Sequence, residues 1–356
     1  MNEYDNEKVF KLGLTLFREE DEIPCFKEAI KTYIKELSYV VTESNNVIGF
    51  ILVCKKMTKI YMAGAGGMLG EAFYNVFKNN FEVKCTDIDL NETWLSYMDF
   101  RNIDQYRNDV NTFKPDWIFH LGAFTDLEYC EKHPDDTYQT NTKSVENAVI
   151  IANELKIPIL YISTAGIFDG LKDVYDETDI PVPLGQYGNT KYLGEKFVVE
   201  NAYKFLVCRA GWMMGGGRSK DKKFVKKVIQ QIIDGKTELN IVNDKLGTPT
   251  YTYDFAKNVE LLLNKNQNGL FNMVCGGLTG RLEVAKEIVK ILNIEKSITI
   301  NEVPTNYFKE IYFAERPACE RLINKRLNDL NLNIMDDWQI ALNKYIQTDF
   351  LDLIKK

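Results

Sequence analysis

The sequence predicts an α/β fold, with a doubly wound parallel sheet, a smaller C-terminal substrate lobe and a small N-terminal α+β appendage. Three observations support this prediction: strands and helices alternate from Met57 onward, a glycine-rich turn follows the first of these strands, and residues 1–56 lack the alternation. Such alternation produces right-handed βαβ units, whose parallel strands are covered by helices on both faces.

The expected strands are short apolar runs separated by helical segments. They cover residues 59–63, 82–87, 117–121, 158–163 and 205–210. After about Gly211 the pattern becomes less regular, as expected of a lobe that closes over the strand ends and carries substrate contacts.

Residues 1–56 form a different unit. The run CFKEAIKTYIKE has helical spacing, and SYVVTESNNVIGFILVCK predicts two strands joined by a turn at Asn45 and Asn46. Helix and hairpin resemble the opening of a GNAT-type acetyltransferase, but the likeness ends before the loop that would hold acetyl-CoA. We therefore expect a non-catalytic appendage over 1–56, with a packing or partner role, and one cofactor- and substrate-binding domain over 57–356.

Composition restricts the classes of function. The net charge of −7 argues against a nucleic-acid partner, and no apolar run approaches the length of a membrane span. The N-terminus is no signal peptide, and seven scattered cysteines without a CxxC pair indicate reduced thiols in a cytoplasmic protein. Two histidines and no Cys/His cluster make a structural zinc site improbable.

The run YMAGAGGMLG is the most informative motif. Gly64 lets the backbone turn sharply after the first strand, Gly67 lets the main chain approach a phosphate, and Gly70 lets the next helix pack closely on the sheet. The amides at that helix N-terminus would face a diphosphate. Alone, the spacing is also compatible with an ordinary glycine-rich loop.

An acidic residue strengthens the dinucleotide interpretation. Asp87 ends the second predicted strand, where a carboxylate can accept hydrogen bonds from both adenosine ribose hydroxyls. Its charge would repel a 2′-phosphate, so NAD(H) is favoured. NADP(H) is the alternative, because Lys84 lies nearby in sequence. A solvated strand end is the simpler interpretation of Asp87.

Catalytic candidates follow the fourth expected strand. Ser163 and Thr164 stand at its end, and Tyr187 and Lys191 share a helix face four residues apart. An ammonium beside the phenol would lower its barrier to proton exchange at neutral pH. In this scheme Thr164 orients a substrate carbonyl, Tyr187 transfers the proton and Lys191 also holds the nicotinamide ribose. Tyr and Lys at this spacing are more often just an exposed pair.

The order of these motifs resembles the extended short-chain dehydrogenases, and more narrowly the dTDP-4-dehydrorhamnose reductase family. The likeness spans Lys59 to about Tyr345. The segments that carry it are HLGAFTDLEYCE, TNTKSVENA, STAGIFDG, RAGWMMG, DKLGTPTYTYDFA and ERPACERL.

The resemblance implies a role for each matching residue. Gly64, Gly66, Gly67, Met68 and Leu69 would line the pyrophosphate, Asp87 would meet the ribose, Asp99 and Phe100 would border the adenine, and Leu121, Gly122 and Ala123 would face the cofactor. Asn141 would support Lys191 through water, Ala165 and Trp212 would touch the sugar with Thr164, and residues 248–251 would help shape the nucleotide end.

Plainer interpretations stand beside these roles. Asp99 and Asn141 could be helix caps, Trp212 could belong to the core, and the basic run 218–227 could be a solvated helix face instead of a diphosphate site.

Two departures from the family pattern bear on the substrate. The usual Ser-Thr-Asp-Tyr-Val-Phe has Ala165 and Gly166 in place of Asp and Tyr, which removes an acceptor and a ring from the sugar pocket. His120 stands where an asparagine is typical, and we expect it to have a structural role.

The resulting hypothesis is an NAD(P)H-dependent reductase of a 4-keto-6-deoxy nucleotide sugar that serves polysaccharide biosynthesis. One alternative is a nucleotide-sugar epimerase or dehydratase, which uses the same residues and returns the hydride to its substrate. Another is a regulatory subunit of the methionine adenosyltransferase type, which binds the dinucleotide without turnover. Relatives often form homodimers, and some use Mg²⁺ between subunits, but no residue pattern in this chain indicates a metal site.

Overall fold

The computed structural model describes residues 39–43, 46–51, 57–350 and 352, and the chain divides into two units between Met57 and Thr58. In the first unit β1 (Tyr39–Glu43) and β2 (Asn46–Ile51) pair antiparallel, which confirms the two predicted strands. The helix predicted from CFKEAIKTYIKE lies outside the described residues.

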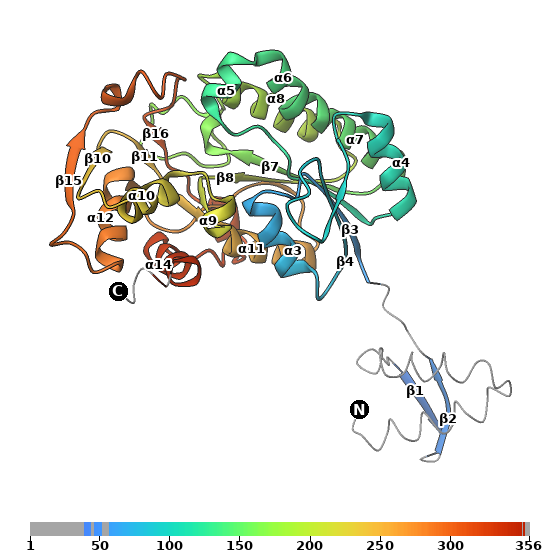
Figure 1. The fold of residues 1–356 in the computed structure, drawn as a ribbon. Coiled ribbons are helices and arrows are strands. Elements are labelled where there is room, and N and C mark those ends of the chain that lie inside the picture. Colours follow the sequence, from blue (N-terminus) through green and yellow to red (C-terminus); the bar gives the residue numbers. More distant parts are fainter. Residues whose placement is uncertain (1–38, 44–45, 52–56, 351, 353–356) are drawn as a thin grey trace. The chain divides into compact units, whose positions relative to one another are not determined.

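A seven-stranded parallel sheet forms the centre of the second unit, in the order β13-β8-β7-β6-β3-β4-β5 (Figure 1). Its strands are β3 (Lys59–Ala63), β4 (Glu82–Asp87), β5 (Leu95–Tyr97), β6 (Trp117–His120), β7 (Ile159–Thr164), β8 (Phe205–Ala210) and β13 (Gly269–Asn272). The order turns back at β3, so β6 and β4 lie on either side of it. A ligand crevice is expected at such a switch point, outside the carboxyl ends of the strands.

Helices cover both faces of this sheet, which is why β3 is apolar along nearly its whole length. One face carries α4 (Ile103–Phe113), α5 (Leu127–Lys132), α6 (Pro134–Tyr138), the π-helical turn η2 (Gln139–Lys143), α7 (Ser144–Leu155) and α8 (Gln186–Asn201). The other face carries α3 (Met68–Phe77) and α11 (Thr252–Asn264), which pack against each other.

A smaller lobe is built mainly from the C-terminal half of the chain. Its strand pairs are β9 (Trp212–Met214) with β12 (Pro249–Tyr251) and β10 (Glu238–Val242) with β15 (Thr299–Val303), and β11 (Leu246–Gly247) lies between β14 (Thr279–Gly280) and β16 (Cys319–Glu320). The helices of the lobe are α9 (Gly217–Lys220), α10 (Phe224–Ile233), α12 (Arg281–Ile291) and α14 (Trp338–Asp349), and η4 (Thr305–Phe308) is a short 3₁₀ turn. A second 3₁₀ turn, η3 (Ala165–Ile167), follows β7 and contacts α8, and α13 (Lys325–Asp329) contacts β13.

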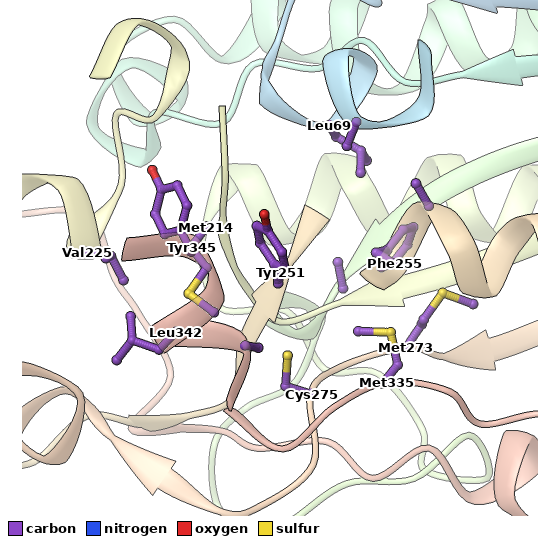
Figure 2. Close-up of a cluster of buried hydrophobic side chains, with 14 of the residues drawn as sticks. Leu69, Met214, Val225, Tyr251, Phe255, Met273, Cys275, Met335, Leu342 and Tyr345 are labelled. Atoms are coloured by element: carbon purple, nitrogen blue, oxygen red, sulfur yellow. The ribbon is translucent and has the colours of Figure 1, made fainter. Parts of the chain in front are cut away.

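The residues after Gly211 do not all belong to the smaller lobe as expected, because the chain returns to the large sheet after forming the first part of that lobe. Strand β13 pairs with β8, and α11 packs on α3. A continuous apolar core follows from this return. Figure 2 shows Leu69 of α3 and Phe255 of α11 in the same cluster as Met214 and Tyr345 of the smaller lobe.

Other composition-based expectations can be compared with the described residues. All five cysteines among them (Cys85, Cys130, Cys208, Cys275 and Cys319) are buried and free of disulfides. None of the described helices is both long enough and apolar enough to span a bilayer.

Candidate active site

The glycine turn after β3 has the backbone geometry that its sequence predicts. Gly64 has φ +76°, and a Cβ there would lie 2.3 Å from Gly122 Cα. A Cβ on Gly70 would lie 2.1 Å from the Ala65 carbonyl oxygen, so only glycine allows α3 to start this close to the turn. At Gly67, by contrast, no atom lies within 4 Å of the Cβ position, which leaves open space over the helix N-terminus.

The side chains next to this turn point in different directions. Leu69 is buried in the core shown in Figure 2, so its side chain is not available to a ligand. The Met68 side chain lies beside Gly216 of the smaller lobe, whose Cβ position is 2.8 Å from Met68 Cβ. The smaller lobe therefore reaches the start of α3.

Asp87 lies at the end of β4 and holds the glycine turn in place. Its Oδ2 accepts a hydrogen bond from the Gly66 amide at 2.8 Å, and its Oδ1 accepts one from the Asp89 amide at 3.0 Å. Lys84 pairs with Asp109 at 2.5 Å. Lys84, the residue expected to weaken a preference for NADH, is therefore held by another carboxylate.

The predicted adenine and cofactor loops adjoin this turn. The Phe100 ring fills the space over Gly122, where a Cβ would come within 2.2 Å of it. Asp99 pairs with Arg101 at 2.8 Å, and hydrogen bonds from Arg101 lower the pKa of that carboxyl. The amides of Leu121 and Gly122 both donate to the Ala63 carbonyl, and Ala123 follows in the same loop.

Asn141 lies in the π-helical turn η2, and its side chain binds backbone. Its Oδ1 accepts from the Phe124 amide at 2.7 Å, and its Nδ2 donates to the Phe124 carbonyl at 3.0 Å. These bonds fix the loop after β6. Support of Lys191 through water, implied by the family resemblance, stays a prediction.

Close packing of α8 on β7 brings the catalytic candidates together. A Cβ on Gly188 would lie 2.4 Å from the Gly166 carbonyl oxygen, and one on Gly194 would lie 2.8 Å from Tyr161 Oη. The two glycines let α8 approach the strand end, and this helix carries Tyr187 and Lys191. Both glycines are visible in the sequence, but no local pattern indicated that they face β7 and the turn after it.

Thr164 and Tyr187 are neighbours. Burial raises the pKa of the phenol to about 12, and the Thr164 hydroxyl offsets part of this rise. The Ser163 side chain is buried, so Thr164 is the hydroxyl available at the strand end. Desolvation therefore dominates the pKa of this phenol, and stabilisation of the phenolate by the lysine and an oxidised nicotinamide stays a prediction.

Lys191 is 5% exposed, and burial lowers its pKa to about 7. Its Nζ lies 4.2 Å from the centre of the Tyr161 ring, and the negative charge of Glu195 partly offsets the burial. The lysine charge and burial together lower the pKa of His120 to about 3, with burial the larger cause. His120 is therefore a neutral, buried group that shares a 3.0 Å hydrogen bond with Ser144, as expected of a structural histidine.

A buried ion pair, not predicted from the sequence, lies one turn beyond Lys191. Glu195 binds Arg209 of β8, with the shortest contact at 2.5 Å and both side chains under 5% exposed. Because the partners are fourteen residues apart in the chain, no local motif indicated the pair.

Trp212, the predicted sugar contact, is partly buried and makes a specific hydrogen bond instead of belonging to the apolar core. Its indole Nε1 donates to Glu320 Oε2 at 2.7 Å, and its ring lies over Gly247, where a Cβ would be 2.3 Å away. Residues Pro249–Tyr251 support this position by pairing with β9. Ala165, the other predicted sugar contact, is buried at the start of η3. Glu320 was not singled out from the sequence, where it was contained only in the matching segment ERPACERL.

The basic run 218–227 makes several bonds within the protein. Lys220 pairs with Glu71 at 3.1 Å and with Glu92 at 2.8 Å, and Lys223 donates to the Thr125 carbonyl at 2.9 Å. These contacts tie the smaller lobe to the cofactor half. Within the described residues, no group of three or more His, Cys, Asp or Glu side chains could hold a metal ion.

A glycine turn at the switch point of the sheet, an acidic strand end and a Thr-Tyr-Lys set together indicate the class of extended short-chain dehydrogenases. Within this class, the chain belongs to the RmlD substrate binding domain family, whose model matches residues 57–350.

Individual relatives agree with this assignment. The chain is 30% identical to a dTDP-4-dehydrorhamnose reductase of Aggregatibacter actinomycetemcomitans, over 80% of this chain and 97% of that protein. It is 28% identical to the spore coat polysaccharide biosynthesis protein SpsK of Bacillus subtilis, over 82% and 98%. A crystal structure of a dTDP-4-dehydrorhamnose reductase from Bacillus anthracis in complex with NADP has 27% identity and a TM-score of 0.75, covering 82% of this chain and all of that one.

Proposed function

We propose that this protein reduces the ketone of a 4-keto-6-deoxy nucleotide sugar with a nicotinamide cofactor, in the supply of deoxysugars for a polysaccharide. The observation that carries the proposal is the proximity of Tyr187 on α8 to Thr164 at the carboxyl end of β7, with Lys191 one turn further along the same helix. The names of the relatives, which include dTDP-4-dehydrorhamnose reductases, support the same substrate class.

The residues around the glycine turn fit a dinucleotide. The N-terminus of α3 has no side-chain cap, and the open space at Gly67 leaves its amides free to meet a diphosphate. When bound, the nicotinamide supplies the hydride for the carbonyl carbon. Asp87 would accept from the adenosine ribose, and because Lys84 is paired with Asp109, the charge favours NADH over NADPH.

The remaining chemistry belongs to the protein's own side chains. With its pKa raised to about 12, Tyr187 keeps its proton at neutral pH and can donate it to the oxygen of the reduced carbon. The Thr164 hydroxyl, next to the phenol, would orient the substrate oxygen. Lys191 would bind the nicotinamide ribose, and its pKa of about 7 lets it exchange protons at physiological pH.

We also propose that residues 57–356 form the catalytic domain and that 1–56 is an accessory unit. A homodimer and a cytoplasmic location are further parts of the proposal, by the family resemblance.

The test follows NADH consumption with dTDP-, UDP- and GDP-linked 4-keto-6-deoxy sugars. We expect turnover with one of the three nucleotides and its loss in Tyr187→Phe. Tyr203→Phe is the matched control, because Tyr203 is 66% exposed and follows α8. Stoichiometric bound NAD with no net NADH consumption would instead support an epimerase or dehydratase. A copurifying synthetase without turnover on any sugar would support the regulatory alternative.

A further inference from the structure

Three groups converge on one point above Gly166. A Cβ built on this glycine would lie 3.4 Å from Glu320 Oε1, 3.5 Å from Thr164 Oγ1 and 3.7 Å from Tyr187 Cε1. Two of these atoms belong to the residues that bind and protonate the substrate oxygen in the proposed reaction. The third is a carboxylate oxygen from the smaller lobe, so Glu320 faces the same small space.

The Glu320 carboxylate is held by one side-chain hydrogen bond, and the backbone that follows it is fixed by two more. Its Oε2 accepts the Trp212 indole hydrogen at 2.7 Å. The neighbouring backbone is joined to the loop after β7, because the Tyr175 amide donates to the Arg321 carbonyl at 2.9 Å and the Ile323 amide donates to the Tyr175 carbonyl at 3.0 Å.

The second carboxylate oxygen remains available. Within the described residues, Oε2 takes the only hydrogen bond recorded for this side chain, so Oε1 has unused acceptor capacity. Arg281 lies beyond, with its guanidinium 4.9 Å from the centre of the Trp212 ring, and its charge acts on Glu320 without a direct ion pair. An acceptor fixed beside a catalytic hydroxyl favours a ligand that carries a hydrogen-bond donor.

From this geometry we infer that Glu320 selects the sugar, by accepting a hydrogen bond from a hydroxyl or amine on the carbon next to the ketone. The inference rests on the proposed function. In a 4-keto-6-deoxy sugar, carbon 5 carries the methyl group, so the donor would stand on carbon 3. The missing side chain at Gly166 provides the room for this substituent.

The first experiment compares two substrates in two enzymes. The pair is a dTDP-4-keto-6-deoxyhexose with a 3-hydroxyl group and its 3-deoxy analogue, and the enzymes are wild type and Glu320→Ala. In wild type we expect kcat/KM to favour the 3-hydroxy sugar by ~10- to 100-fold, as a charge-assisted hydrogen bond would give. In Glu320→Ala this preference should fall to within about threefold, mostly because kcat/KM for the 3-hydroxy sugar decreases.

Controls separate recognition from folding. Glu315→Ala removes an exposed carboxylate five positions earlier in the chain and should keep the wild-type preference. NADH affinity should be unchanged in both variants. An equal loss on both sugars in Glu320→Ala would indicate a merely structural role and overturn the inference, as would an unchanged preference.

Gly166→Ala gives an independent test. The new methyl group would make ordinary van der Waals contacts with its three neighbours, so the fold and NADH binding should be preserved. We expect a larger loss on the 3-hydroxy sugar than on the 3-deoxy sugar. The opposite order would show that the substituent does not occupy this space.

Calorimetric binding of the two sugars makes failure of the inference distinguishable from failure of the proposed function. If wild type oxidises no NADH with any keto sugar, the proposed function fails. A Glu320-dependent difference in dissociation constant would still support the inference, and equal constants in wild type and Glu320→Ala would overturn it.

Discussion

Lys191 gives the sharpest prediction, because burial of its ammonium should destabilise the folded protein. Its pKa falls from 10.5 to about 7 in the folded protein. Below about pH 7, the folded and unfolded chains both carry the proton, and the folded state bears the full cost of burying the charge. Between these two pKa values only the unfolded chain stays protonated, so stability rises with pH by about 1.4 kcal/mol per pH unit.

The magnitude follows for a practical pH range. From about pH 7.5 to about pH 9, wild type should gain about 2 kcal/mol through Lys191 alone. Lys191→Met keeps much of the volume and removes the titration, so this gain should be absent from the variant. At about pH 7 the apo variant should be more stable than wild type, although its cofactor affinity and turnover should both fall.

Urea denaturation of the apo protein at the two pH values measures this difference. Lys196→Met is the matched control, since Lys196 lies on the same helix with its side chain 55% exposed. Groups that titrate elsewhere affect all three proteins equally. Parallel stability changes in wild type and Lys191→Met would refute the argument that burial sets the charge state of this lysine.

Three further predictions concern the cofactor half and proton transfer. Tyr187→Phe should lower turnover by ~10²- to 10⁴-fold with NADH affinity nearly unchanged, and wild-type turnover would exclude Tyr187 as the proton donor. Asp87→Asn keeps an oxygen for the Gly66 amide but removes the charge, so the NADH-to-NADPH ratio of kcat/KM should fall about tenfold; an unaltered ratio would assign the preference elsewhere. Gly70→Ala should cost about 1–3 kcal/mol in thermal unfolding because its methyl would collide with backbone. Gly67→Ala, in open space, should keep the melting temperature and lower only cofactor affinity, and a similar loss of stability in both variants would contradict this assignment.

Sequence reasoning was strongest where a local pattern determines the structure. Alternating apolar runs predicted five strands of the large sheet, and the glycine turn had the expected backbone. Strands β5 and β13 were missed, because runs of three and four residues carry too little periodicity to separate them from loops.

Contacts between distant segments could not be predicted in the same way. Glu320 meets Trp212 across 108 residues, and Glu195 meets Arg209 on another element. Gly188 and Gly194 appear unremarkable inside a helical pattern until the strand they approach is known. The desolvation that shifts the pKa values of Tyr187 and Lys191 could not be predicted either, because it depends on packing that only the fold reveals.

The backbone bonds that join Tyr175 to residues 321 and 323 have a consequence for how ligands enter and leave. A rigid-body rotation of the smaller lobe away from the large sheet would break both bonds and expose the shared apolar core. Exchange by local side-chain and loop movements avoids this cost. We therefore expect free and ligand-bound forms to have nearly the same radius of gyration in small-angle X-ray scattering. Local side-chain and loop movements would then determine the rate of product release.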